Sequence, residues 1–414
     1  MEPFIPVHSG EHVFETLAND LQASQQRQAL LVADENTYTA CGQQVNETLS
    51  AAGLDVTQVI LSGQPWVAAD ETNMAEVLQA LNGRELALVA VGSGTVTDIT
   101  RFVAFQTRLP FYSVPTAPSV DAYTSYTAAI TIRKVKYSFA TKTASGVYAS
   151  LPVLCAAPQR MIASGFGDMV AKYTALADWK LAHLLVGESL DETAVRQAEA
   201  ALQSCILQAA AIRAAEPSGI AALIESLFVS GRCMVRVGSS RPAAGAEHSL
   251  AHYWEIQHQL NHKPEALHGE KTGTASVIIA GLYEKLRQMT RQEAQRRLNR
   301  FCLSSPEPEI ARIQSAYGAV ASQVIANRTS FLGPFGQKID LFSERLLSRW
   351  DDVQAIAAQV PSVDQIRTLL QSAGAAWQPD QIHVSKDEVR HAIQSAMYIR
   401  DRLTILELNH MLDL

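Results

Sequence analysis

Cysteine is scarce in this chain of 414 residues, and the scarcity excludes two kinds of site. The five cysteines are odd in number and widely spaced, and no two stand in a CxxC pair. Such spacing predicts neither a disulfide framework nor a thiolate zinc site, and it fits a reducing compartment. We therefore expect a cytoplasmic protein. The cysteines are Cys41, Cys155, Cys205, Cys233 and Cys302.

Long apolar runs and clusters of basic residues are also missing. No apolar run approaches the roughly 18 residues that span a bilayer, so we expect no membrane anchor. The start, Met1-Glu2-Pro3, has no basic segment followed by an apolar one, so no signal peptide is expected. The net charge is −7 and the Lys and Arg residues are dispersed, which argues against nucleic acid as a partner.

What the chain does contain is the composition of a soluble globular protein, 47% hydrophobic and 18% charged. Its length predicts two domains. Four short apolar runs with helix-like segments between them, such as 71–82, predict a Rossmann-like parallel α/β domain over residues 1–160. The expected strands are 29–33, 59–61, 86–91 and 111–115.

The character changes after about residue 160, where long Ala-, Leu- and Gln-rich stretches carry apolar residues at helical spacing. They predict an all-α domain over residues 161–414, which would bind metal and substrate. The segment Thr329 to Asp340 holds two Gly and a Pro, so we expect a loop there. The expected helices are 167–186, 191–213, 217–237, 243–260, 270–288, 308–325 and 385–408.

The most informative motif is a group of histidines. His248 and His252 are four residues apart, so a helix places them on one face. His268 follows just beyond Pro264, and three imidazoles in this arrangement suggest a metal site that Asp168 could complete. Ser249 stands where a zincin would have Glu, so this is not that protease motif.

Other polar residues near these have simpler explanations. Asp168 starts the expected helix, and taken alone it would be a carboxylate that complements the helix dipole. Lys172 and Asp178 lie further along that helix and are interpreted as structural. His258 and His262 continue the polar face of the histidine helix and are expected to be solvated.

A glycine turn, Gly92 to Asp98, follows a buried strand and opens a helix. Glycines there let backbone N–H groups approach a phosphate, but Thr97 replaces the third glycine of the usual fingerprint. A dinucleotide turn and a plain strand-to-helix turn are therefore about equally supported. Asp34 ends an earlier strand; it could bind an adenosine ribose and repel a 2′-phosphate, but a helix N-cap is the preferred interpretation.

The loop Pro115 to Ser125 follows the fourth strand and holds two prolines, five hydroxyl groups and one carboxylate. Loops at the carboxyl ends of parallel strands are where open α/β sheets bind ligands. We expect a binding loop rather than a merely polar surface loop.

Together these stretches resemble the glycerol-1-phosphate dehydrogenases, and most closely their bacterial AraM type. The resemblance rests on ordered motifs that span nearly the whole chain, and it extends to Met397-Tyr398-Ile399-Arg400-Asp401-Arg402. The wider superfamily includes iron-type alcohol dehydrogenases, glycerol dehydrogenase and dehydroquinate synthase, which implies a dehydroquinate synthase-like fold. The matching motifs are the glycine turn, Pro115 to Ser125, Gly165 to Trp179, Ser240 to His248, and Leu267 to Glu270.

The resemblance implies a role for each matching position. The metal ligands would be Asp168, His248 and His268, and Asp168 would also touch the substrate. Asp121 and His252 would bind substrate and take part in catalysis; this removes His252 from the ligand set that the spacing alone allows. The residues expected to bind the dinucleotide are Asp34, Gly92, Ser93, Gly94, Thr95, Asp98, Thr116, Ala117, Pro118, Ser119 and Ser125.

The implied activity is reversible hydride transfer between NADH, or alternatively NADPH, and dihydroxyacetone phosphate, giving sn-glycerol 1-phosphate. One divalent ion, Ni²⁺ or Zn²⁺, and a homodimer are also implied, as is a product for lipid or other glycerophosphate synthesis. Lys142, Lys172, Arg241 and Lys271 are candidates for binding the substrate phosphate, and nothing singles one out.

Two alternatives remain. One is another enzyme of this scaffold, either glycerol dehydrogenase or a dehydroquinate-synthase-like cyclase. The other is a metal-binding relative without turnover. The A-P-S-V-D and G-A-E-H motifs favour the phosphate enzyme over the first. The intact set of Asp121, Asp168, His248, His252 and His268 argues against the second.

Overall fold

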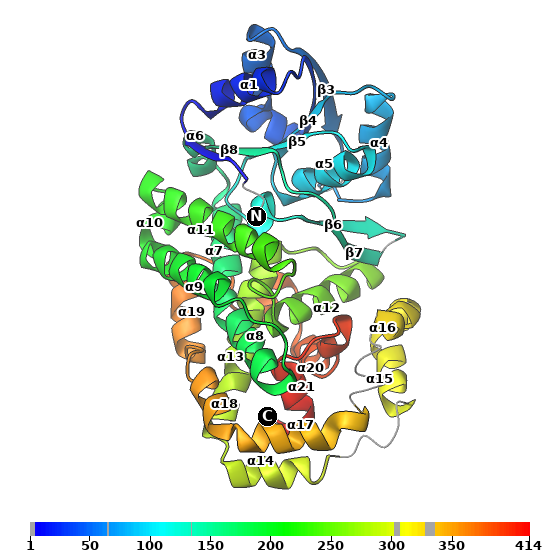
Figure 1. Ribbon diagram of the computed structural model, residues 1–414, viewed down its shortest axis with the longest axis vertical. Coiled ribbons are helices and arrows are strands. Elements are labelled where there is room, and N and C mark those ends of the chain that lie inside the picture. Colours follow the sequence, from blue (N-terminus) through cyan, green and yellow to red (C-terminus); the bar gives the residue numbers. More distant parts are fainter. Residues whose placement is uncertain (1–4, 64–65, 134, 302–306, 328–335) are drawn as a thin grey trace. The chain divides into compact units, whose positions relative to one another are not determined.

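The computed structural model describes residues 5–63, 66–133, 135–301, 307–327 and 336–414 (Figure 1). By internal packing the chain forms two units. Unit 1 comprises Met1–Phe166 and Gln203–Gly238, and unit 2 comprises Gly167–Leu202 and Ser239–Leu414. The domain limits 1–160 and 161–414 remain a prediction, and one cut in the chain cannot represent units that interleave in this way.

Unit 1 is built on a six-stranded parallel sheet with the order β1-β8-β5-β4-β2-β3. The central strands are runs of apolar residues buried on both faces, as a parallel sheet between helices requires. This confirms the predicted α/β class and all four predicted strands. The strands are β1 (Val7–Gly10), β2 (Gln28–Asp34), β3 (Asp55–Leu61), β4 (Ala87–Gly92), β5 (Phe111–Pro115) and β8 (Gly146–Ser150).

Helices cover both faces of this sheet. Helices α1 (Val13–Ala23) and α3 (Gln43–Ala51) bury their apolar stripes against alternate residues of β2 and β4, such as Leu31 and Val89. Because successive strand residues point to opposite faces, Leu30 and Leu88 face the other side, where helices α4 and α5 pack. Helices α4 (Glu71–Leu81) and α5 (Gly94–Thr107) are drawn in light blue in Figure 1.

The sequence did not predict the antiparallel pair β6 (Thr127–Ile132) and β7 (Val135–Ala140). The short 3-10 helix η2 (Asp121–Thr124) leads into it from the loop after β5. Unit 1 also contains several other helical segments. They are α2 (Glu35–Thr37), the π-helical turn η1 (Tyr38–Gly42), α6 (Leu151–Cys155), α10 (Ala209–Arg213) and α11 (Pro217–Val237).

Two of the three unit boundaries fall inside helices α7 (Gln159–Val170) and α9 (Glu192–Leu207), and the third follows the end of α11. Within its described residues unit 2 is helical and contains no strand, which confirms the all-α prediction. No helix of the described chain is both long and apolar enough to span a membrane. Its helices are α8 (Lys172–Val186), α12 (Ala246–Leu260), α13 (His268–Gln288), α14 (Arg291–Leu298), α15 (Glu307–Tyr317), α16 (Ala321–Asn327), α17 (Gly336–Ser348), α18 (Trp350–Ala357), α19 (Val363–Ser372), α20 (Lys386–Ser395) and α21 (Ile405–Leu412), with 3-10 turns at Gly318–Val320, Pro379–Ile382 and Ala396–Ile399.

Several predicted helical details are wrong. The stretches 167–186, 191–213 and 308–325 are each divided between two helices, at Ala171, at Gln208 and at the 3-10 turn Gly318–Val320. The stretch 385–408 is not one helix, because it passes through a 3-10 turn and extended backbone before α21. Residues 336–340 of the predicted loop belong to α17, while 329–335 lie outside the described residues. Asp168 lies in the last turn of α7 rather than at a helix start, so the helix-dipole interpretation fails.

Candidate active site

The predicted histidine pair lies on helix α12, which begins at Ala246 after Gly245. The helix places His248 and His252 one turn apart, with ring centroids separated by 6.3 Å. His268 is the first residue of α13, and its ring lies 5.1 Å from that of His248 and 6.1 Å from that of His252. The structure therefore brings all three predicted histidines together.

A close crossing of α7 and α13 brings the carboxylate to these rings. A Cβ atom at Gly167 would lie 2.3 Å from the carbonyl oxygen of Gly269 and 3.6 Å from the Cα of Gly273. Only a residue without a side chain fits such an approach. Because Gly167 precedes Asp168 and Gly269 follows His268, the crossing sets two predicted ligands beside each other.

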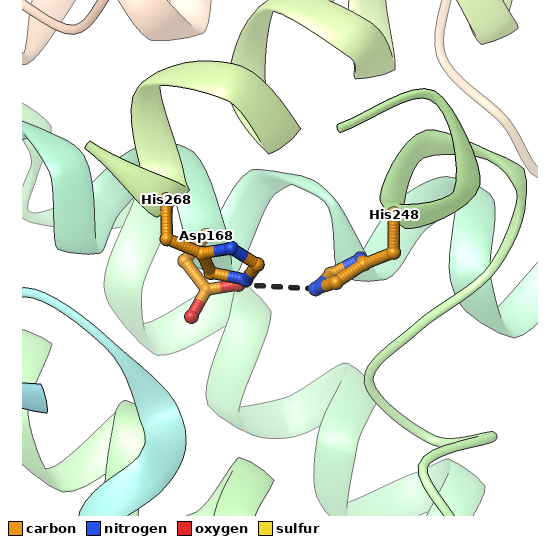
Figure 2. A group of neighbouring side chains, drawn as sticks. All are labelled: Asp168, His248 and His268. Atoms are coloured by element: carbon orange, nitrogen blue, oxygen red, sulfur yellow. Dashed lines mark ion pairs between the residues drawn. The ribbon is translucent and has the colours of Figure 1, made fainter. Parts of the chain in front are cut away.

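Asp168, His248 and His268 form one compact group (Figure 2). A ligand atom from each lies within 4.8 Å of the others, and Nε2 of His248 is 3.7 Å from Oδ1 of Asp168. Donor atoms that share an ion at about 2 Å each lie at comparable separations. One carboxylate and two imidazoles are a donor set that suits divalent Zn, Ni or Fe, so these residues fit the predicted ion.

A carboxylate lies near Nδ1 of His248, and another lies near Nδ1 of His268. Nδ1 of His248 lies 2.8 Å from Oε1 of Glu247 and donates to it, which leaves Nε2 with its lone pair facing Asp168. Nδ1 of His268 lies 3.7 Å from Oε1 of Glu255. Metal-binding histidines commonly have such carboxylates, which fix the tautomer and orient the ring.

The charges around the group favour a neutral imidazole. Burial, and then the neighbouring His268 and Lys172, hold the pKa of His248 well below its ordinary value. Lys172 is fully buried and its Nζ lies 2.9 Å from Oδ1 of Asp168, so it balances that carboxylate. A neutral ring with an available Nε2 is the form that binds a metal ion.

His252 has different partners. Its Nδ1 lies 3.0 Å from Oε2 of Glu255, and its Nε2 lies 3.0 Å from Nη2 of Arg400. Since a carboxylate only accepts and a guanidinium only donates, Nδ1 carries the proton and Nε2 accepts. This arrangement keeps His252 beside the group of three ligands, with an acceptor nitrogen suited to proton transfer.

The predicted dinucleotide residues lie on unit 1 at the carboxyl ends of β2, β4 and β5. These strands are neighbours, and the chain moves outward from β2 to β3 and then returns to place β4 on its other side. Open α/β sheets bind ligands at such a switch point. The turn is tight, since a Cβ at Gly92 would lie 2.5 Å from the Cβ of Val96. The side chain of Ser93 does not cap α5, so it leaves this helix N-terminus to other acceptors.

Asp34 is a helix N-cap, as preferred from the sequence. Its Oδ1 accepts from the backbone N–H of Thr37 at 2.8 Å, and the Thr37 hydroxyl accepts from the Asp34 N–H at 2.9 Å. The carboxylate still stands at the end of β2, so a contact with an adenosine ribose stays a prediction.

Asp98 has an internal structural role. Its Oδ1 lies 3.2 Å from Nη1 of the buried Arg101, and its Oδ2 accepts from the N–H of Ala129 at 3.0 Å. Arg101 also donates to the carbonyl oxygens of Ala122 and Thr127, both at 2.6 Å. This pair ties the loop after β5 to α5, and a direct cofactor contact by Asp98 is still a prediction.

The loop after β5 is ordered by its own hydroxyl groups. The Tyr123 hydroxyl donates to the carbonyl of Ala117 at 2.6 Å, and Ser119 and Ser125 are buried. Thr116 donates its N–H to the carbonyl of Gly92 at 3.3 Å, which joins this loop to the glycine turn. The predicted cofactor residues of the two motifs therefore share one edge of the sheet.

Helix α11 supports Asp121, and the sequence did not predict this. Ser230 donates to Oδ2 of Asp121 at 2.7 Å, and Thr124 donates to the carbonyl of Phe228 at 2.8 Å. These bonds hold η2 against α11, so a helix more than a hundred residues away in sequence orients the predicted substrate carboxylate.

One expectation about polar residues is wrong, and two of the candidates for binding the substrate phosphate, Lys142 and Lys271, have partners within the protein. His258 is fully buried rather than solvated, and neither ring nitrogen has a hydrogen-bond partner among the described residues. Lys142 donates to the carbonyl of Leu109, and Nζ of Lys271 lies 2.8 Å from Oε1 of Glu255. Sequence reasoning missed Glu255, although it lies three residues after His252 on the same helix face.

Comparison of the sequence with known proteins identifies the family of this chain. Residues 8–158 match the family model for iron-containing alcohol dehydrogenases. The chain is 33% identical to the glycerol-1-phosphate dehydrogenase (NAD(P)+) of Geobacillus thermodenitrificans, over 95% of this chain and 89% of that protein. It is 34% identical to the Bacillus subtilis protein of the same name, over 96% and 89%. The chain belongs to the glycerol-1-phosphate dehydrogenase family.

Solved structures agree on the fold of this family member. An archaeal alcohol dehydrogenase from a Red Sea brine pool superposes with a TM-score of 0.66 at 14% identity, covering 100% of this chain and 97% of that one. A probable glycerol dehydrogenase from Sinorhizobium meliloti has a TM-score of 0.62 at 15% identity, covering 94% and 88%. At such identities the likeness concerns architecture alone.

Proposed function

We propose that this protein is an sn-glycerol-1-phosphate dehydrogenase, which reduces dihydroxyacetone phosphate with NAD(P)H and catalyses the reverse reaction. The observation that carries the proposal is the group of Asp168, His248 and His268 with His252 beside it. The curated relatives at 33–34% identity carry this enzyme's name over nearly the whole chain.

The residues proposed to hold the divalent ion are Asp168, His248 and His268, with Glu247 fixing the His248 tautomer. When bound, the dinucleotide supplies the hydride, and the ion supplies the positive charge that polarises a carbonyl. Two imidazoles and a carboxylate are compatible with Ni²⁺ or Zn²⁺; nickel is favoured by the AraM-type resemblance and zinc by the wider superfamily.

His252 is the proposed proton donor and acceptor. Its Nδ1–H is held by Glu255, and Nε2 would accept the proton of a substrate hydroxyl in place of its present bond from Arg400 during oxidation and return it during reduction. Asp121, held by Ser230, would accept hydrogen bonds from the substrate hydroxyls. The glycine turn and the loop Thr116–Ser119 would bind the dinucleotide phosphates and nicotinamide. Asp34 at the end of β2 favours NAD over NADP, since a carboxylate repels a 2′-phosphate.

The test is NADH consumption with dihydroxyacetone phosphate by metal-stripped protein, before and after Ni²⁺ or Zn²⁺ is added back. We expect turnover only with metal, and a product of sn-1 rather than sn-3 configuration. His268→Ala should abolish the metal-dependent turnover. Full activity of His268→Ala after chelation and dialysis would remove the metal assignment.

Glycerol dehydrogenase is the nearest competing outcome. Metal-dependent oxidation of glycerol by NAD, without reduction of dihydroxyacetone phosphate, would keep the site and change the substrate. Absence of any NADH oxidation would favour a metal-binding relative without turnover. The family resemblance extends the proposal to a homodimer, which sedimentation would test, and to a cytoplasmic enzyme of glycerophosphate synthesis.

A further inference from the structure

Two arginines of unit 2, Arg400 and Arg402, meet at Ser240, which begins the motif leading into α12, and a third arginine is its neighbour in sequence. Arg400 Nη1 donates to the Ser240 hydroxyl at 2.9 Å, and Arg402 Nη2 donates to the same oxygen at 3.2 Å. Arg241 follows Ser240 directly. Two guanidinium groups that donate to one neutral hydroxyl are an unusual arrangement of partly buried positive charge.

The three arginines differ in how their charge is balanced. Arg241 forms a two-pronged ion pair with Glu188, through Nε at 2.6 Å and through Nη2. Arg402 has no such partner within the described chain; its Nη1 donates to the carbonyl of Ala244 at 3.1 Å. Burial, and then repulsion by Arg400 and Arg241, hold the pKa of Arg402 well below its ordinary value. A negative charge placed here would relieve that repulsion.

Arg400 connects the pair of Arg400 and Arg402 to His252. Its Nη2 lies 3.0 Å from Nε2 of His252, whose ring is 6.3 Å and 6.1 Å from the two histidines proposed as ligands. Arg400 and Arg402 are only half-buried, so a small anion can reach them. A guanidinium is planar and carries five N–H donors, which suits it to the oxygens of a phosphate.

We propose that Arg400 and Arg402, with the Ser240 hydroxyl between them, form the subsite that binds the phosphate of a three-carbon substrate. The inference rests on the proposed function, in which the substrate's carbonyl end lies at Asp168, His248 and His268. With the phosphate on the arginines, the short carbon chain passes His252. The subsite makes the enzyme specific for a phosphorylated triose over dihydroxyacetone or glycerol.

The competing explanation is that the arginines only fasten the segment after the 3-10 turn Ala396–Ile399 to the start of α12. A structural role would lower stability and reduce activity with every substrate. A phosphate role would act on the phosphorylated substrate far more than on the unphosphorylated one. The experiment must therefore separate recognition of the dianion from folding.

The experiment divides the substrate into two pieces, dihydroxyacetone and phosphite dianion. With metal-loaded wild-type protein, we expect phosphite to raise kcat/KM for dihydroxyacetone by about tenfold or more, because binding of the remote dianion assists the reaction. Arg402→Met should lose this activation, and its kcat/KM for dihydroxyacetone phosphate should fall by about 10- to 100-fold. Arg402→Lys keeps the charge without the planar fork and should lie between the two.

Two further measurements keep the inference testable if Arg402→Met folds poorly. Titration calorimetry of sn-glycerol 1-phosphate with metal-stripped protein should show weaker binding in Arg402→Lys, with an unchanged melting temperature. Adding guanidinium ion should partly restore the activity of Arg400→Ala. The matched control is Arg390→Met, which removes an exposed arginine paired with Asp387 and should leave phosphite activation unchanged.

The outcomes separate the two proposals. If wild-type protein reduces dihydroxyacetone phosphate but the variants keep full phosphite activation and full affinity for sn-glycerol 1-phosphate, the arginine subsite is refuted and the proposed function stands. If wild-type protein shows no such turnover but binds sn-glycerol 1-phosphate in an Arg402-dependent way, the subsite stands and the activity is a different one.

Discussion

Two carboxylates determine which ring nitrogen of His248 and of His252 remains available as an acceptor. Glu247 accepts from Nδ1 of His248, and Glu255 does the same for His252. Burial raises the pKa of Glu247, while the hydroxyl of Thr174 and the N–H of Gly245 counteract that rise. Two residues of one helix thereby orient two imidazoles toward different tasks, one toward the proposed ion and one toward the substrate proton.

The carboxylate of Glu388, in helix α20 of unit 2, provides a test with a defined dependence on pH. Glu388 pairs with Lys263 at 2.6 Å and accepts from the N–H of Ser385 at 2.9 Å, and these bonds outweigh burial and lower its pKa to about 2. A depressed pKa means that the charged form stabilises the fold above the unfolded value of 4.5, and that this is lost as the pH falls toward 2.

Glu388→Gln should therefore reduce the free energy of unfolding by roughly 0.5–1 kcal/mol at pH 7, and by much less near pH 3. Urea unfolding of both proteins at the two pH values measures the difference. Asp387→Asn, which removes an exposed carboxylate on the same turn, is the control and should change little. An equal difference at both pH values would contradict the assignment.

Residue types and spacing predicted that His248, His252 and His268 gather, because helical geometry and the position of Pro264 bring them together. The narrower set of Asp168, His248 and His268 was implied by the family resemblance, and it is this set that forms the compact group. The same reasoning failed for His258, which continues the polar face of α12 but is buried by elements distant in sequence. It also left the phosphate contact open, because Arg400 and Arg402 reach Ser240 across about 160 residues.

Elements meet at this site through small residues. The crossing of α7 and α13 at Gly167 and Gly269 brings Asp168 to His268. The motifs G-F-G-D and H-G-E thus each contain a proposed ligand and, next to it, a glycine that the close packing of the two helices requires. The geometry of two ligands depends on one helix contact.

Gly167→Ala should separate the two helices. Its methyl group would clash with the backbone at Gly269, which cannot rotate away, and overpacking of this kind costs about 1–3 kcal/mol. We expect a lower melting temperature and weaker metal binding, measured by competition with a chromogenic chelator. Gly281→Ala in α13 is the control: its methyl group would only touch Val363 at 3.7 Å, so metal affinity should be kept. Equal metal affinity in both variants would show that the crossing does not position the ligands.

The predicted helix boundaries agree with the structure where the sequence carries clear capping residues. Helix α11 spans the predicted range, with Pro217 at its first position and the left-handed Gly238 after its end. The stretch 385–408 keeps apolar residues at helical spacing but breaks where Arg400 becomes extended, and periodicity alone does not signal that break. The β6–β7 pair was missed because Asp98 and Arg101, on α5, supply part of what holds it.

On the scale of the whole molecule, both units are discontinuous in sequence. Residues 203–238 return to unit 1 between two parts of unit 2. Asp168 and the two histidines proposed as ligands therefore belong to segments of unit 2 that this excursion separates. An ion held by all three would join those segments, and its binding free energy would add to the stability of unit 2.

Chelation should therefore lower the melting temperature of the purified protein, and adding the ion back should restore it. At a free ion concentration of 100 times Kd, the stabilisation is about 2.7 kcal/mol. Differential scanning calorimetry with and without chelator measures the shift. His248→Ala should melt at the same temperature in both conditions, and a full shift in this variant would show that the ion binds elsewhere.

The interleaved order of the two units has a consequence during protein synthesis. All of unit 1 has been made once the ribosome passes Gly238, whereas Asp168 waits for His268, 100 positions later (268 minus 168). At about 5–20 residues per second, that wait is about 5–20 s. The proposed ligand set is complete only after all of unit 1 has been made, so loading of the proposed metal would be a late event in the life of each new chain.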